Sequence, residues 1–361
     1  MSTTSETVLT KAEMLFNKIL PHVSNVYELK MVSVLGKGAF GTVYKVMDSN
    51  TGELYVLKVA TAYNPLIMEM ALREKKVLDS RNFADTCGIN RSFVCTTINK
   101  LIMVDDSRYA LILMPYIPDS ESLQEFINTG FPHCTYSLDP PNTCLVSAHN
   151  LAKATIVQNA VHAITIMHNA GIAHRDIKPD NLLVLKNLKI YVIDFGTACI
   201  NNNPNLACKN ILGTLDYMAP EEFTASIGVH PTFKSYDLTF AEQVKADIWS
   251  LGISLWQLFI EGNTDKMPYQ NMQSMNRERQ QALFERVYIE FPPEQAAILA
   301  PMLVYDPDHR RMPSEEDIAT FMHMSAGEEL SSVAISTVGE VGGDATQLLG
   351  ELVGGFYALF S

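Results

Sequence analysis

Three absences narrow the classes to which this chain can belong. No stretch reaches about 18 consecutive apolar residues, so the sequence predicts no transmembrane helix. Lys and Arg number 27 against 40 Asp and Glu, and the net charge of −13 argues against a surface for nucleic acid or an anionic membrane. The first residues show no basic stretch followed by an apolar run, so no secretory signal is expected. Together these absences favour an intracellular protein of the cytoplasm or nucleus.

Cysteine is also sparse and scattered along the chain. The six cysteines are Cys87, Cys95, Cys134, Cys144, Cys199 and Cys208. None of them forms a CxxC pair, which argues against a zinc site. In an intracellular protein, thiols with no such pattern are expected to be reduced.

What is present is enough apolar sequence for a large core and enough length for two lobes. The 361 residues are 47% hydrophobic and 19% charged. Residues 1–26 form an N-terminal extension with a helical pattern, and the sequence after them shows the patterns of β-strands. The strands are expected over 27–35, 41–48, 52–60, 100–106 and 108–116, with one helix over 66–80. After Pro118 the pattern is helical, with a long helix over 150–171 and a nearly all-apolar, buried helix over 246–262.

A glycine-rich segment, GKGAFGTV, lies between the first two predicted strands. Glycines at Gly36, Gly38 and Gly41 allow a tight turn and a close approach of backbone N–H groups to phosphate oxygens. A Rossmann or P-loop site differs, because a helix follows its glycines. On its own the spacing fits either nucleotide binding or a plain hairpin.

Lys58 lies in the third strand and could be a solvated edge lysine or a lysine that faces phosphates. The second interpretation needs a carboxylate on the following helix. Glu74 is the better partner because Val77 and Leu78 follow it at helical spacing, but Glu69 stays open as an alternative.

The segment HRDIKPDN carries the chemistry of a phosphoryl transfer. Asp176 could orient the hydroxyl of an attacking group, and Lys178 could neutralise the transferred phosphoryl group. Asn181 offers a carbonyl oxygen to a hard cation, and Asp194 of the IDFG segment follows 13 residues later with a carboxylate. That spacing is the one expected of two ligands of one metal site on adjacent loops.

Three further segments complete a resemblance: GTLDYMAPE (213–221), DIWSLG (247–252) and DPDHR (306–310). With them the chain resembles the eukaryotic-type protein kinases, with the motifs in family order over residues 27–324. Lys178 and the GT before Tyr217 resemble the serine/threonine type. The resemblance implies an α+β, two-lobed protein-kinase-like fold, with a small antiparallel β lobe (27–114), a hinge (115–119) and a larger helical lobe (120–324).

The resemblance also implies roles for single residues, with ATP and Mg²⁺ bound in the cleft. Asp176 is similar to the catalytic base and Lys178 to its neighbouring lysine, while Asn181 and Asp194 are similar to the magnesium ligands. Glu221 and Arg310 resemble a buried ion pair, and Asp247 resembles a residue that braces the catalytic loop. The nucleotide-binding positions are Leu35, Gly36, Lys37, Gly38, Ala39, Phe40, Gly41, Val43, Val56, Lys58, Glu74, Met114, Pro115 and Ile117.

Two departures from the family pattern concern the adenine site. Val56 stands where the family usually has alanine, and Pro115 replaces a common glutamate of the hinge. Pro115 has no N–H to donate, which leaves the N–H of Ile117 for the base.

A third departure concerns regulation. Residues 198–213 contain no Ser, Thr or Tyr, whereas many protein kinases carry a phosphate there that pairs with the arginine at the position of Arg175. We therefore expect activity without phosphorylation of this activation segment.

The remaining segments leave alternatives open. Inserts at about 130–150 and 223–243 could be docking surfaces or solvated loops. The tail, 325–361, has five acidic residues and no Lys or Arg, so it is expected to pack in cis or to bind a partner rather than a membrane. The expected substrate is a protein with a Ser or Thr acceptor. The rival functions are a pseudokinase that acts as a nucleotide-binding scaffold and a small-molecule or lipid kinase, against which the GTLDYMAPE segment argues.

Overall fold

The structure is a computed structural model, and its described residues fall into two compact units. One unit ends at Pro118, and the other contains the described residues from Asp119 onward. The described residues are 10–23, 27–38, 41–61, 65–84, 98–104, 107–129, 143–208, 213–222, 238–263 and 277–338.

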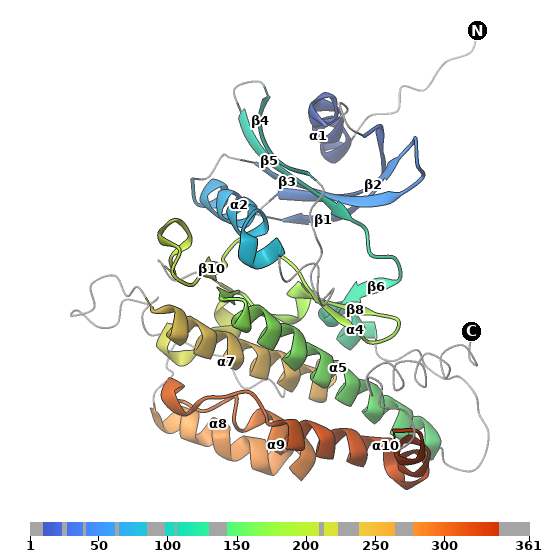
Figure 1. The fold of residues 1–361 in the computed structure, drawn as a ribbon, viewed down its shortest axis with the longest axis vertical. Helices are drawn as coiled ribbons and strands as arrows, with labels where there is room; N and C mark the ends of the chain where they lie inside the picture. Colours follow the sequence, from blue (N-terminus) through green and yellow to red (C-terminus); the bar gives the residue numbers. More distant parts are fainter. Residues whose placement is uncertain are drawn as a thin grey trace. The chain divides into compact units, whose positions relative to one another are not determined.

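The first unit is built on a five-stranded antiparallel sheet with the strand order β1-β2-β3-β5-β4 (Figure 1). Its strands are β1 (Leu29–Gly38), β2 (Gly41–Asp48), β3 (Leu54–Thr61), β4 (Ile98–Val104) and β5 (Ser107–Pro115). Its helices are α1 (Lys11–Ile19), η1 (Leu20–His22) and α2 (Pro65–Leu78). The five strands expected from the sequence are confirmed.

Helices cover both faces of this sheet because the strands alternate in what they bury. On one face, Phe16 and Ile19 of α1 pack against Tyr44 and Leu57. The Tyr44 hydroxyl also donates a hydrogen bond to the Ala12 carbonyl at 2.9 Å. The other face carries α2, whose Ala71 clusters with Ala60 of β3 and Ala110 of β5. Lys58 and Val56 lie on this second face, since their side chains alternate with that of Leu57.

The second unit is mainly helical and carries two small sheets. Its helices are α4 (Leu123–Thr129), α5 (Thr143–Asn169), α7 (Phe240–Phe259), α8 (Arg277–Glu290), α9 (Pro293–Leu299) and α10 (Glu315–Val338), with short turns η2 (Pro179–Asn181), η3 (Pro204–Leu206), η4 (Leu215–Tyr217) and η7 (Pro307–His309). The sheets are β6 (Ser120–Ser122), β8 (Leu182–Leu185) and β9 (Ile190–Val192), and β7 (Ile172–Ala173) with β10 (Cys199–Ile200).

Helix α7 is the buried centre of the second unit, as its apolar sequence predicts. Trp249, Leu251, Leu255 and Trp256 are at most 1% exposed. A Cβ added at Gly252 would lie 2.8 Å from Leu303, so the helix packs closely against the chain that precedes η7. A small antiparallel sheet unit and a larger helical unit confirm the predicted fold class.

Several helices extend beyond the bounds expected from sequence. α5 begins at Thr143, inside the insert expected at about 130–150, because no Gly or Pro stands between Pro141 and Gly171 to stop the helix. α7 begins at Phe240, behind a capping box in which Thr239 and Glu242 exchange hydrogen bonds. α10 continues past Met324 to Val338. Residues 339–361 of the tail and the other residues of the two inserts lie outside the described residues.

In the part of the chain that the structure describes, no helix combines the length and the apolar character needed to cross a bilayer.

Candidate active site

The glycine-rich segment forms the hairpin between β1 and β2. Gly38 pairs with Gly41 across the hairpin, and Ala39 and Phe40 at its tip lie outside the described residues. Gly41 has a φ of +137°, and a Cβ there would lie 2.0 Å from the Val59 carbonyl oxygen, so only glycine fits.

Beside the hairpin, the backbone at Gly36 has open space around it and apolar side-chain surface is exposed. A Cβ at Gly36 would meet nothing within 4 Å, and Leu35 is 48% exposed. Lys37 is exposed in β1, and Val43 lies directly opposite Lys58 in the neighbouring strand. An open backbone beside exposed apolar carbon suits a flat apolar ring and its phosphates.

Lys58 is held by Glu74, as expected, and not by Glu69. Lys58 Nζ lies 2.7 Å from Glu74 Oε2, and the Glu74 side chain is only 4% exposed. Glu69 instead lies 3.7 Å from Arg73 and is 52% exposed. The pair fixes a cationic Nζ on the α2 face of the sheet.

The predicted adenine-site residues follow one another at the end of β5. Met114 lies opposite Val56, and Pro115 lies opposite Tyr55. The Tyr116 N–H donates to the Leu54 carbonyl, and Ile117 lies just beyond the strand. The antiparallel register thus places Val56 and Met114 beside each other on the same face as Lys58.

In the second unit, Asp247 of α7 anchors the loop that carries Asp176. Its carboxylate accepts hydrogen bonds from the backbone N–H groups of His174 and Arg175, both at 2.7 Å. His168 Nε2 lies 2.9 Å from the same carboxylate. Asp247 is 1% exposed, so the loop is fixed to the centre of the unit.

Asp176 is oriented by Thr214 and Lys178. Its Oδ1 accepts hydrogen bonds from the Thr214 N–H at 2.8 Å and from the Thr214 hydroxyl at 2.7 Å. Lys178 Nζ donates to the Thr214 hydroxyl oxygen at 2.8 Å and lies 3.3 Å from Asp176 Oδ2. A carboxylate beside an ammonium group suits chemistry on a hydroxyl and an anion.

Asn181 and Asp194 are brought onto adjacent loops by the backbone. The Ile193 N–H donates to the Asn181 carbonyl at 3.0 Å, and Asp194 follows with a φ of +65°, a strained value for a residue other than glycine. Asn181 Nδ2 donates to the Asp176 carbonyl at 2.7 Å, which orients the amide.

These two residues fit a hard cation that also binds phosphate. Amide and carboxylate oxygens are the donors that Mg²⁺ prefers, and Mg²⁺ usually takes few protein ligands and completes its shell with water and phosphate. Among the described residues no group of three or more His, Cys, Asp or Glu could hold a metal ion. Water and the oxygens of a bound phosphate would complete the shell.

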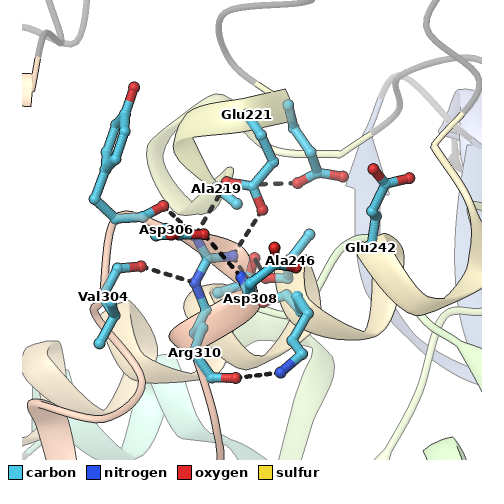
Figure 2. A network of polar contacts seen from close by, with 12 residues as sticks. Ala219, Glu221, Glu242, Ala246, Val304, Asp306, Asp308 and Arg310 are labelled. Carbon is cyan, nitrogen blue, oxygen red and sulfur yellow. Dashed lines mark hydrogen bonds and ion pairs between the residues drawn. The ribbon is translucent and has the colours of Figure 1, made fainter.

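Arg310, which is buried, and Glu221, which is partly exposed, form a bidentate ion pair (Figure 2). Arg310 Nη1 and Nη2 lie 2.7 and 3.0 Å from the two carboxylate oxygens of Glu221. The guanidinium also donates to the carbonyls of Val304, Lys245 and Tyr305. Arg310 is fully buried, so the pair joins the end of the GTLDYMAPE segment to η7.

Glu222, next to this pair, is buried, and the nearby charge of Arg175 only partly offsets the effect of that burial. It is 3% exposed, and its Oε1 has no hydrogen-bond partner among the described residues. Burial, with Glu221 and Asp247 nearby, raises the pKa of the Glu222 carboxyl to about 8. This carboxyl is therefore mainly protonated at neutral pH.

The expectation of reduced thiols is wrong for two of the six cysteines. Cys199 and Cys208 form a disulfide within the activation segment, with a Cα–Cα distance of 5.1 Å. β10 pairs Cys199 with Ala173, and the η3 turn reverses the chain so that Cys208 returns beside Cys199. The search for CxxC pairs missed it because nine positions separate the two residues.

The sequence interpretation also missed Gln243. Its Oε1 accepts a hydrogen bond from Arg175 Nε at 2.9 Å. Gln243 lies four residues before Asp247 on α7, so helical spacing places both on one face. That spacing was the available signal, but the helix was expected to begin after residue 243.

Comparison with known proteins assigns this arrangement to a family. The family described as protein kinase domain matches residues 29–320. Similar proteins are a mitogen-activated protein kinase kinase 7 of Arabidopsis thaliana (28% identical over 237 residues) and an Aurora kinase of Saccharomyces cerevisiae (25% over 297 residues). A Rho-associated protein kinase, let-502, of Caenorhabditis briggsae is 26% identical over 236 residues.

Coverage differs widely among these relatives. The matches cover 64%, 81% and 64% of this chain, and 64%, 69% and 17% of the respective relatives. The chain thus spans less than two thirds of the Arabidopsis protein and about a sixth of the Caenorhabditis protein.

Proposed function

Because this chain belongs to the protein kinase domain family, we propose that it transfers the γ-phosphoryl group of ATP to Ser or Thr hydroxyls of protein substrates. The observation that carries the proposal is the set of contacts around Asp176. Thr214, near the start of the GTLDYMAPE segment, holds this carboxylate by hydrogen bonds, and the ammonium group of Lys178 lies beside it. Family relatives named serine/threonine-protein kinases, such as AtPK1/AtPK6 of Arabidopsis thaliana, support the choice of acceptor.

Each residue has a defined task in this proposal. Asp176 orients the acceptor hydroxyl and takes its proton, while Lys178 offsets the charge of the transferred group. Lys58, held by Glu74, contacts the phosphates of ATP, and the hairpin around Gly36 and Gly41 covers them. Asn181 and Asp194 would hold Mg²⁺, which neutralises phosphate charge when bound.

We also propose that the activity needs no phosphate on the activation segment. Residues 198–213 offer no hydroxyl to accept one. Thr197 at the start of the segment has a structural task, because its hydroxyl donates to the His174 carbonyl at 2.8 Å. The Thr214 hydroxyl is engaged with Asp176.

The test is transfer from labelled ATP, with Mg²⁺, to generic proteins and to a Ser/Thr peptide library. An Asp176→Asn variant should lower kcat by about 10²–10⁴-fold, because the general base is removed. Phosphatase treatment of the wild type should leave its activity unchanged, and phosphosite mapping checks that the phosphate has been removed. ATP binding without any transfer would instead favour the pseudokinase alternative.

A further inference from the structure

Arg175 sits where the catalytic loop, the activation segment and α7 meet. Only 4% of the residue is exposed, although its side chain carries a permanent charge. Its Nε donates to Gln243 Oε1 at 2.9 Å, and its Nη1 donates to the Thr197 carbonyl at 3.2 Å. Its backbone has a φ of +69° and donates to Asp247, so the next residue, Asp176, depends on how Arg175 is held.

Both ends of the activation segment reach this arginine. Thr197 at the start accepts its Nη1 hydrogen bond. Near the end, Gly213 has a φ of +131°, and an added Cβ would lie 2.6 Å from the Arg175 carbonyl oxygen. Thr214, which holds Asp176, follows directly. A displacement of Arg175 would therefore move the groups that orient the catalytic carboxylate.

Gln243 supplies a fixed acceptor for the guanidinium. The residue is 1% exposed and projects from the first turns of α7, which the capping box of Thr239 and Glu242 secures. A neutral amide suits this place because the nearby Asp247 carboxylate already accepts from His174, Arg175 and His168. A guanidinium buried in this way exposes little surface to a phosphate arriving from solvent.

We propose that Gln243 is a positioning residue that takes the place of an activation-segment phosphate by holding Arg175. The inference rests on the proposed function and deepens it, because it assigns to one side chain the order that phosphorylation supplies in many protein kinases. The guanidinium of Arg175 stays in place without modification, and it keeps Thr197, Thr214 and Asp176 aligned.

The test compares three variants of the full chain after phosphatase treatment. Gln243→Met has a similar size and no acceptor, whereas Gln243→Glu restores an acceptor for Arg175. Ser254→Ala is the matched control, because Ser254 is fully buried on the same helix and its hydroxyl bonds only the Ser250 carbonyl among the described contacts. Should Gln243→Met fail to fold, Gln243→Asn withdraws the acceptor by one methylene.

We expect Gln243→Met to lower kcat by about 10- to 100-fold, the effect of losing one hydrogen bond to a charged group, with KM for ATP within about twofold. Gln243→Glu should recover most of the activity, and Ser254→Ala should match the wild type. In a double-mutant cycle with Arg175→Met, the two losses should not add, because Gln243 acts through Arg175.

Hydrogen exchange in segments 174–178 and 197–206 separates this inference from the proposed function. Faster exchange in Gln243→Met, but not in Gln243→Glu, would support the positioning role even if the wild type transferred no phosphate. Unchanged kcat and unchanged exchange in Gln243→Met would overturn it. Equal losses in Gln243→Met and Ser254→Ala would also overturn it, since they would indicate general damage to α7.

Discussion

Two buried arginines of the helical unit differ in the contacts that the described residues make with them. Arg310 is fully buried and meets a carboxylate, Glu221, through two short hydrogen bonds. Arg175 is nearly as buried and meets a neutral amide and a backbone carbonyl. An ion pair fixes two segments permanently but is costly to break, whereas neutral acceptors leave the carboxylate Asp247 for the backbone of the catalytic loop. The difference separates a residue that holds the fold from a residue that holds the reacting groups.

Breaking the ion pair should have the largest effect on stability. In Glu221→Gln, Arg310 would remain buried with its charge uncompensated, and the free energy of unfolding should fall by about 3–5 kcal/mol. Urea denaturation measures this loss. The matched change at the other arginine, Gln243→Met, should cost much less stability and much more kcat. Equal losses of stability in the two variants would contradict the comparison.

Opening the disulfide should have the next largest effect. The bridge between Cys199 and Cys208 closes a loop with a separation of nine residues, which should contribute about 2–3 kcal/mol by restricting the unfolded chain. The double variant Cys199→Ser, Cys208→Ser should lose this contribution under non-reducing conditions. A dithiol should lower the stability of the wild type and leave the variant unchanged. If the dithiol affected both equally, the loss could not come from this bridge.

Glu222 sharpens the comparison because its carboxyl group lies near both Glu221 and Arg175. Its pKa in the folded state is about 8, above the ordinary value of 4.5, so the folded state keeps a proton that the unfolded chain releases between these two values. Its contribution to stability is thus complete below about pH 4.5 and is lost as the pH rises to about 8.

The Glu222→Gln variant should therefore lack part of the pH dependence of the wild type. In that window the wild type should lose at most about 1.4 kcal/mol per pH unit through this one carboxyl. Denaturation of both proteins at pH 5, 6, 7 and 8 measures the difference. Parallel stability curves for the two proteins would show that Glu222 titrates normally.

An ion pair with an exposed carboxylate should show the smallest effect. Glu69 lies 3.7 Å from Arg73 and is 52% exposed, so Glu69→Ala should change the free energy of unfolding by less than about 0.5 kcal/mol. Glu74→Ala, on the same helix, removes the partner of Lys58 and should lower phosphate transfer. A loss of activity in Glu69→Ala comparable to that in Glu74→Ala would mean that the two glutamates share the role.

The sequence predicted the parts of the fold that depend on local pattern. Alternating apolar residues located the five strands of the first unit, and helical spacing favoured Glu74 over Glu69 as the partner of Lys58. The predicted roles in nucleotide and metal binding stay predictions. Their geometry within each unit agrees with those roles, and the assays above test them.

The parts that could not be predicted depend on contacts between distant segments. The disulfide requires β10 to pair with β7 and η3 to reverse the chain, which no spacing rule for cysteines includes. The bond between Arg175 and Gln243 joins residues 68 positions apart. Gln243 was not predicted as the partner of Arg175 because the helix was expected to begin after it. The Thr239–Glu242 capping box is the sequence pattern that would have placed the start of α7 before Gln243.

The packing of α1 has a practical consequence for preparing the protein. The family match begins at residue 29, yet Phe16, Ile19 and Val23 cover the face of the sheet that carries Tyr44 and Leu57. A recombinant fragment trimmed to the family boundaries would bare this apolar face to water and would be prone to aggregate. The smallest soluble fragment should therefore begin before Thr10, the residue that caps α1.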